Sequence, residues 1–453
     1  MRTRQLLTGI LVAGAVHARG AAGQQRAPVA TDLDTIVARA LATSPSLHAA
    51  SARIDAARAR VRPASALPDP MLMLGIINQP LASMAALPGT AEGPDPMTMR
   101  MVGVSQRIPY PGKLVLQKRT AEREVEASEA ALDAARRQLV RDVKVAYFEI
   151  AFIDKALEIV ARNGDVLTGL ITVSASRYSV GAAGQQDVLK ARVEATRLAD
   201  VAAGLSEQRV AMVAQLTALL DLPSDTPVPP LMVPEGIARA AVAASPGAMR
   251  FASAALGSRV SDSPLRPLDA LQDAAVRGSP EIREHRAALA VQAARVEIAR
   301  REHLPDVDLS LQYGQRGGGL PDMISATVSL PIPIFKGRKQ DQQVAEAAAQ
   351  LAALEGEHHR MVNVVRADVA RLVSEIERER TRLALAVKAI LPQSRAALMS
   401  ATANYQVGKV EFLAVLENQS TVFSYETDYF RALSDFAAKV AELERMVGSE
   451  VLQ

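Results

Sequence analysis

The feature that most constrains this 453-residue chain is that its two halves carry the same landmarks in the same order. Five landmarks recur in one order, each made of the same residue types. The pairs are Leu33-Asp34 through Ser44-Pro45 with Leu268-Asp269 through Ser279-Pro280, Leu67-Pro68-Asp69 with Leu304-Pro305-Asp306, Val104-Ser105 and Ile108-Pro109 with Val328-Ser329 and Ile332-Pro333, Tyr178-Ser-Val-Gly181 with Tyr405-Gln-Val-Gly408, and Val188-Leu189 with Val415-Leu416. Such self-similarity predicts an internal duplication. We expect a first repeat over 24–230, a Pro- and Ala-rich linker over 231–264, and a second repeat over 265–453.

Each repeat contains two segments in which apolar and polar residues alternate. From Val307 to Tyr313 every second residue is apolar, and Ile324, Ala326 and Val328 continue this period beyond a run of three glycines. A period of two predicts strands with one apolar and one polar face. We expect strands at about 70–78, 97–107, 305–314 and 322–331. Their length suits a tilted strand that crosses a bilayer, which takes about 9–11 residues, although a soluble hairpin would give the same pattern.

Long helices are predicted after each pair of strands. No proline occurs from Gly112 to Leu222, and apolar residues recur there at alternating spacings of three and four, which is typical of a coiled-coil seam. The seam is formed by residues 132, 139, 143, 146, 150, 153, 157 and 160. We expect helical hairpins at 113–222 and 338–450, with arms of about 50 residues or roughly 75 Å. Pro392 predicts a bend or a split in the second hairpin.

The first 23 residues have the features of a secretory signal peptide. Arg2 and Arg4 precede the apolar run Leu6 to Val16, and small residues follow it. This order of charged, apolar and small-residue regions is typical of exported proteins, and the run is too short for a membrane anchor. The chain contains no cysteine, so we expect neither disulfides nor a lipid anchor.

Composition excludes several classes of function. The formal net charge is +3, and the basic residues are scattered among acidic ones, which argues against nucleic-acid binding. The sequence has no P-loop and no Gly-x-Ser-x-Gly motif. We therefore expect no catalytic residues and no cofactor.

Two strand pairs and two long helical hairpins, repeated after a signal peptide, resemble the TolC family of outer-membrane efflux proteins. The resemblance covers nearly the whole mature chain and includes the Tyr-x-x-Gly element of both halves. It implies a mainly α fold with a membrane β-barrel portion, in which each protomer of a homotrimer gives four strands to a twelve-stranded barrel continued by an α-helical periplasmic tunnel. It also implies a passive exit duct in outer-membrane lipid that works with a periplasmic adaptor and an inner-membrane pump of the resistance-nodulation-division type.

Within this family the chain is similar to the branch that serves heavy-metal pumps. The residues that carry this likeness are Pro68-Asp69-Pro70-Met71, Asp95-Pro96-Met97-Thr98-Met99, and Val104-Ser105-Gln106 followed by Ile108-Pro109. The resemblance therefore favours metal ions or small toxic compounds as the exported substrate.

The Tyr-x-x-Gly elements break long helical patterns, so we expect them to form the turns at the periplasmic tip. By the resemblance, the tip residues that contact the adaptor are Tyr178, Val180, Gly181, Tyr405, Val407 and Gly408. The acidic residues after the turns, Asp187 and Glu417, are then candidates for the pore gate, and Lys190 is one helical turn from Asp187 and could neutralise it. The same charges would also suit an ordinary solvated helix end.

Six of the 14 methionines lie in or near the first strand pair: Met71, Met73, Met84, Met97, Met99 and Met101. Thioethers are soft ligands that suit Cu(I), but methionine is also an ordinary lipid-facing or core residue, and we favour that interpretation. His358 and His359 are adjacent and point in different directions on a helix, so we predict no metal site there.

The alternative to a duct is a periplasmic coiled-coil adaptor, which has a single helical hairpin beside a β-rich domain.

Overall fold

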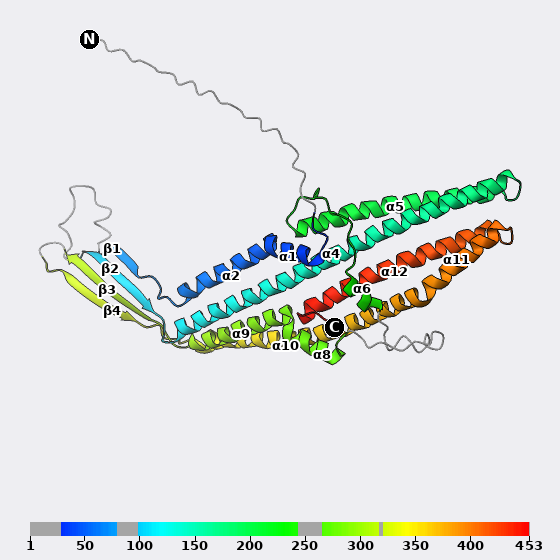
Figure 1. Ribbon diagram of the computed structural model, residues 1–453. Coiled ribbons are helices and arrows are strands. Elements are labelled where there is room, and N and C mark those ends of the chain that lie inside the picture. Colours follow the sequence, from blue (N-terminus) through cyan, green and yellow to red (C-terminus); the bar gives the residue numbers. More distant parts are fainter. Residues whose placement is uncertain (1–28, 79–97, 243–264, 317–319, 453) are drawn as a thin grey trace, which may run out of the picture.

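The computed structural model describes residues 29–78, 98–242, 265–316 and 320–452. The molecule is elongated, with a β-sheet at one end and long helices that run from it to the other end (Figure 1). The expected signal peptide, most of the linker at 231–264, and the three glycines at 317–319 lie outside the described residues. No helix within the described ranges is long and apolar enough to cross a membrane.

The elements follow the duplicated order. The first half contains α1 (Leu33–Thr43), α2 (Pro45–Ala64), β1 (Met71–Ile77), β2 (Met99–Ile108), α4 (Lys113–Ser179), α5 (Gln185–Leu219) and α6 (Glu235–Val242). The second half contains α8 (Leu268–Gly278), α9 (Pro280–Arg301), β3 (Val307–Arg316), β4 (Met323–Ser329), α10 (Gln340–Leu385), α11 (Leu391–Gln406) and α12 (Phe412–Val447). The four strands occur in the four alternating segments, so the mainly α fold with a β portion is confirmed.

The strands form one antiparallel sheet in the order β1-β2-β3-β4. Its two hairpins have equivalent registers. Leu74 is opposite Val102 in the first hairpin, and Leu311 is opposite Ala326 in the second. These two pairs correspond under the duplication, because the Leu-Pro-Asp and Val-Ser landmarks lie at the same offsets from them. Pairing of β2 with β3 joins the repeats.

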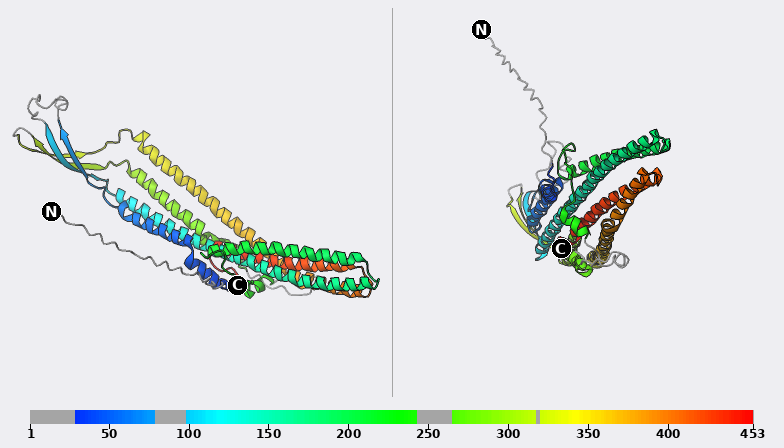
Figure 2. Two further views of the ribbon diagram at one scale, coloured as in Figure 1. Left: turned by 90° about the horizontal axis from the view of Figure 1, so that it is seen from above. Right: turned by 45° about the vertical axis from the view of Figure 1, so that its right-hand side comes forward.

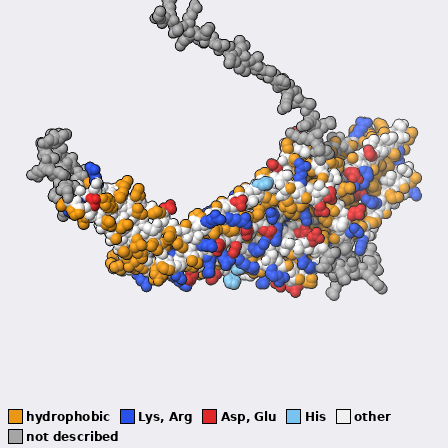
Figure 3. All heavy atoms as spheres, turned by 60° about the vertical axis from the view of Figure 1, so that its left-hand side comes forward, with side chains coloured by type: hydrophobic (Ala, Val, Ile, Leu, Met, Phe, Trp, Pro, Cys, Tyr) orange, Lys and Arg blue, Asp and Glu red, His pale blue; other side chains and the backbone are white. Residues whose placement is uncertain are grey.

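One face of this sheet is apolar and exposed on all four strands. Residues directly opposite each other across strands share a face, which places the alternating apolar residues of each strand together. The exposed members are Leu72, Leu74, Ile76, Val102, Val104, Leu309, Leu311, Tyr313, Ile324 and Val328. Figure 3 shows hydrophobic side chains crowded over the strand end, while charged side chains are spread over the helices.

The helical arms differ in length from the expected 50 residues. α4 has 67 residues and α5 has 35, so the first arm runs unbroken from the sheet to the far tip. In the second repeat α10 (46 residues), a five-residue π-helical turn at Ala386–Ile390 and α11 (16 residues) together match α4 in length. The π-helical turn lies directly before Pro392, which lacks the N–H that a continuous α-helix needs.

The predicted seam of α4 is buried. Val143, Ile150 and Ile153 are fully buried there, and Val369 and Ile376 are the corresponding core residues of α10. α2 and α9 pack beside the sheet-proximal part of α4, whereas α5 packs beside its distal part, and Figure 2 shows these helices side by side from a second direction. The long helices α4 and α12 therefore bury one stripe along much of their length, whereas α10 buries residues only in its second half.

Candidate functional site

The two helix–helix turns at the distal tip have the same backbone geometry. α4 ends before Gly181, whose φ is +73°, and α11 ends before Gly408, whose φ is +76°. The Ala182 N–H donates to the Arg177 carbonyl at 2.8 Å, and the Lys409 N–H donates to the Asn404 carbonyl at 2.9 Å. Glycine ends helices in this way because it adopts positive φ without a Cβ penalty. The Tyr-x-x-Gly elements therefore turn the chain at equivalent positions.

A cluster of three side chains connects these two turns. The Tyr405 hydroxyl donates to the Asp187 carboxylate at 3.5 Å, the long limit for a hydrogen bond. The Arg177 guanidinium lies over the Tyr405 ring, 4.6 Å from its centroid, and donates to the Tyr405 carbonyl and to the Ala182 carbonyl. Burial and the Asp187 carboxylate raise the pKa of Tyr405, so this hydroxyl remains a donor. Arg177 and Asp187, from the first hairpin, thus hold Tyr405 of the second.

The equivalent tyrosines of the two turns have opposite surroundings. Tyr405 is 3% exposed and packs against the Phe412 ring. Tyr178 is 48% exposed, and Val180 and Val407 are exposed beside the turns. The duplication predicts equivalent tip residues, but only the second tyrosine is part of the contact between the hairpins. Tyr178, Val180 and Val407 are instead exposed at the tip.

An open groove runs along the tip between the first turns of α5 and α12. Four aliphatic residues, two uncharged polar residues, one base and two acids line it: Leu189, Val193, Leu413, Leu416, Gln186, Ser420, Lys190, Glu194 and Glu417. Lys190 and Glu417 line the same groove, whereas Asp187 is directed to Tyr405. Within the part of the chain that the structure describes, Lys190 forms no ion pair with Asp187. The base expected to neutralise Asp187 therefore lines the groove instead, although a step of three residues keeps the two positions adjacent on α5.

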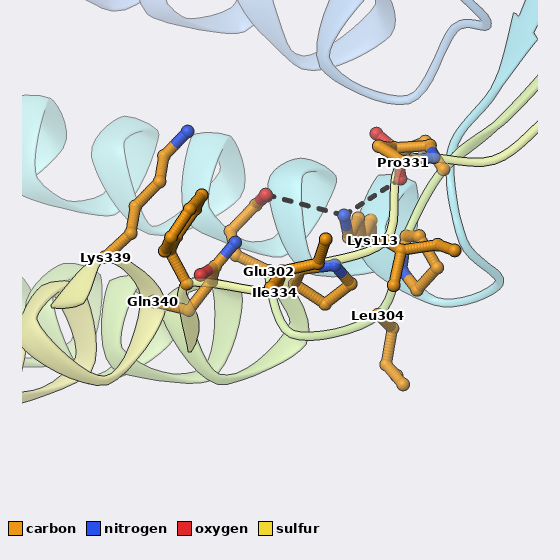
Figure 4. A pocket seen from close by; sticks show the side chains of 12 residues that line it. Lys113, Glu302, Leu304, Pro331, Ile334, Lys339 and Gln340 are labelled. Carbon is orange, nitrogen blue, oxygen red and sulfur yellow. Dashed lines mark hydrogen bonds and ion pairs between the residues drawn. The ribbon is translucent and has the colours of Figure 1, made fainter. Parts of the chain in front are cut away.

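Sequence reasoning missed a second polar cluster, where the sheet meets the helices. Lys113, the first residue of α4, is 4% exposed and donates to Asp306 at 2.8 Å. Its Nζ is also 3.5 Å from Glu302, and Figure 4 shows Lys113 and Glu302 facing each other across the pocket. Burial alone would raise the pKa of Asp306, but hydrogen bonds from Lys113 and the Tyr110 N–H hold it below its ordinary value. The repeated Leu-Pro-Asp landmark was the available signal, since Asp306 ends it.

The fold and the paired tips define the class of protein. The chain belongs to the outer membrane efflux protein family, whose model matches residues 36–221 and 271–449. The predicted resemblance to TolC-like channels is thereby confirmed. Members of this family are efflux channels and not enzymes.

Individual proteins of known sequence or structure are similar to this chain. The chain is 24% identical over 341 residues to the cobalt-zinc-cadmium resistance protein CzcC of Cupriavidus metallidurans, which covers 74% of each chain. It shares its fold with the outer-membrane channel OprN (TM-score 0.74, 19% identity, 92% of this chain and 90% of that one). It also shares its fold with CusC (TM-score 0.73, 16% identity, 93% of each chain).

Proposed function

We propose that this chain is the outer-membrane channel subunit of a tripartite efflux pump, a passive exit duct for metal ions or small toxic compounds. The observation that carries this proposal is the four-stranded sheet with one continuous exposed apolar face. Backbone groups at an open sheet edge cannot be left unpaired in lipid, and among the described residues β1 and β4 each have one free edge. Four strands need further copies to close, which supports a homotrimer in outer-membrane lipid with its helices in the periplasm.

The duplication indicates how neighbouring copies would pair. Within one protomer Val104 of β2 lies opposite Leu311 of β3. The equivalent residues in the other repeat are Val328 of β4 and Leu74 of β1. If the contact between copies repeats the contact between repeats, Val328 of one copy lies opposite Leu74 of the next. Both side chains are on the apolar face, so this register keeps the face continuous.

Crosslinking tests this register, since the chain has no native cysteine. We expect the double variant Leu74→Cys and Val328→Cys to give covalent dimers and trimers with a short thiol crosslinker, because side chains opposite each other lie about 5 Å apart. The matched control replaces Thr327 instead of Val328, which puts the second thiol on the other face. Equal crosslinking by both variants, or monomers from both, would refute the register.

The tip is the proposed gate and adaptor contact. Asp187 and Glu417 would form two rings of three carboxylates in the trimer, which attract cations. The apolar groove between α5 and α12, together with Tyr178, Val180, Gly181, Val407 and Gly408, would receive a helical tip of the adaptor. The likeness to CzcC supports metal ions as substrate and a pump of the resistance-nodulation-division type as partner.

Planar-bilayer conductance of the purified mature protein tests the gate. We expect discrete cation-preferring channels, and a lower cation preference in Asp187→Ala and in Glu417→Ala, since each change removes three charges from the pore. Glu207→Ala, on the exposed surface of α5, is the control. Channels whose cation preference is unchanged by both substitutions would support the duct and refute the gate assignment. A water-soluble protein without channel activity would instead favour the adaptor.

A further inference from the structure

The polar face of the sheet carries a group of methionines from both hairpins. The strand registers place Met71, Met73, Met99, Met101 and Met323 on this face, opposite the apolar one. Met323 comes from the second hairpin and was not part of the sequence pattern, while Met84 and Met97 lie outside the described residues. The described methionines lie on the face opposite the exposed aliphatic residues, and their interpretation as ordinary lipid-facing or core residues stays a prediction.

Glycines alternate with these methionines and leave space beside them. Met73 lies opposite Gly103, and Met101 lies between Gly75 and Gly314 on the neighbouring strands. A side chain at Gly103 would collide with Gln312, since an ideal Cβ there is 2.8 Å from the Gln312 Cγ. Met73, Met99 and Met101 are half-buried on this face. The face is thus the more enclosed of the two, with long thioether side chains beside positions that have no side chain.

Three of the methionines surround Gly314. Met101 and Met323 are directly opposite Gly314 on its two neighbouring strands, each about 4.8 Å away along the hydrogen-bonding direction. The Met99 Sδ reaches over the same position and lies 3.4 Å from where a Cβ of residue 314 would be. Methionine is unbranched and has three rotatable side-chain bonds, so the three sulfurs can converge above the glycine.

We propose that Met99, Met101 and Met323 form a thioether site for a soft monovalent cation such as Cu(I). Neutral sulfur ligands favour soft cations and discriminate against hard ones such as Mg²⁺ and Ca²⁺. Met99 and Met101 approach this side-chain-free position from β2, and Met323 approaches it from β4, so three thioether donors are available there. Placing the site in the conducting lumen rests on the proposed function, whereas the site itself needs only the sheet.

The guanidinium of Arg316 lies at this site and lowers its affinity for a cation. The Arg316 Nη1 lies 3.8 Å from the Met323 Sδ, and Arg316 is opposite Met99 on the neighbouring strand. A bound cation must displace this guanidinium, which weakens binding and favours release. An exit duct needs such weak binding, because a tightly held ion would block conduction.

Silver binding tests the site, with Ag(I) as a redox-stable probe for soft monovalent cations. The detergent-purified full chain is titrated with Ag(I), and bound silver per protomer is measured by equilibrium dialysis and elemental analysis. The triple variant Met99→Leu, Met101→Leu and Met323→Leu keeps side-chain volume, and Leu-for-Met exchanges are well tolerated. Its matched control is Met71→Leu, Met232→Leu and Met399→Leu, which removes three exposed thioethers that do not flank Gly314.

We expect the first triple variant to bind Ag(I) about tenfold or more weakly than the unaltered protein, and the control to bind it equally well. Arg316→Gln should tighten binding, which provides a gain-of-function readout that a misfolded variant cannot imitate. Equal binding by both triple variants, or no silver bound by the unaltered protein, would overturn the site. Silver binding without channel conductance would refute the proposed function and leave the site standing.

Discussion

Replacing Arg177 with alanine is expected to open the distal tip of the channel. Arg177 donates to the carbonyls of Tyr405 and Ala182 and covers the Tyr405 ring, so one side chain fastens the first hairpin to the second. Its loss removes one charged hydrogen bond and a cation–π contact between the hairpins, and a second hydrogen bond within the first turn. Such contacts contribute about 1.5 kcal/mol or more, so we expect roughly a tenfold increase in the ratio of open to closed channels.

Single-channel recording of open probability measures this effect. Arg192→Ala is the matched control, because Arg192 is an exposed arginine of α5 near the same tip and its guanidinium has no ion pair among the described residues. Tyr405→Phe keeps the ring beneath Arg177 and removes only the hydrogen bond to Asp187, so its effect should be smaller. An Arg177→Ala channel that opens no more than the Arg192→Ala channel would show that this contact does not restrain the tip.

Replacing Glu379 with alanine is expected to cause a large loss of stability in the helical body. The Glu379 side chain is 1% exposed and accepts hydrogen bonds from Arg378 at 2.8 Å, Arg382 at 3.0 Å and Lys439 at 3.3 Å. Lys439 belongs to α12, so this carboxylate ties α10 to its neighbour. Removing one partner of a buried charge cluster costs about 3–5 kcal/mol. We expect a loss of stability near the lower end of this range, because the side chains of Arg378 and Arg382 reach solvent.

Acid unfolding of the same variant provides a second test. Burial would raise the pKa of Glu379, but Arg378, Lys439 and Arg382 outweigh it and lower the pKa below 4.5. A carboxylate whose pKa is lower in the folded state than in the unfolded state stabilises the fold at pH values above the unfolded-state pKa. This stabilisation is lost as the pH falls through the folded-state pKa. Glu379→Ala should therefore lose less stability on acidification below about pH 4.5 than the unaltered protein.

Thermal and acid unfolding of the full chain in detergent measure both effects. Asp368→Ala is the control, because Asp368 forms an exposed i,i+3 pair with Arg371, and such pairs contribute about 0.5 kcal/mol or less. Equal destabilisation by the two variants would show that burial of Glu379 adds nothing to its contribution.

Local periodicity explains why so much of the fold could be predicted. Period two in Val307 to Tyr313 requires a strand with one apolar face, whatever lies next to it. The seam through Val143, Ile150 and Ile153 requires a helix that buries one stripe. These patterns, repeated in both halves, determined the element types, their order and the resemblance to an efflux channel. Helix length was predicted less well. Pro392 indicated the break before α11, but the arms expected to have about 50 residues have 67 in α4 and 35 in α5, because the seam does not mark where a helix ends.

Which residues contact each other depends on the tertiary structure. Tyr178 and Tyr405 are equivalent in sequence, yet only Tyr405 is buried between the hairpins, because Arg177 and Asp187 approach it from α4 and α5. Lys113 meets Asp306 across a separation of 193 residues, and Met323 joins Met99 and Met101 only through the register of β3. Local backbone geometry fixes which face of a strand or helix each residue occupies, so the residue pattern was enough to predict the faces. The residue that lies across from it depends on how distant segments pack and pair, so it became visible in the folded chain alone.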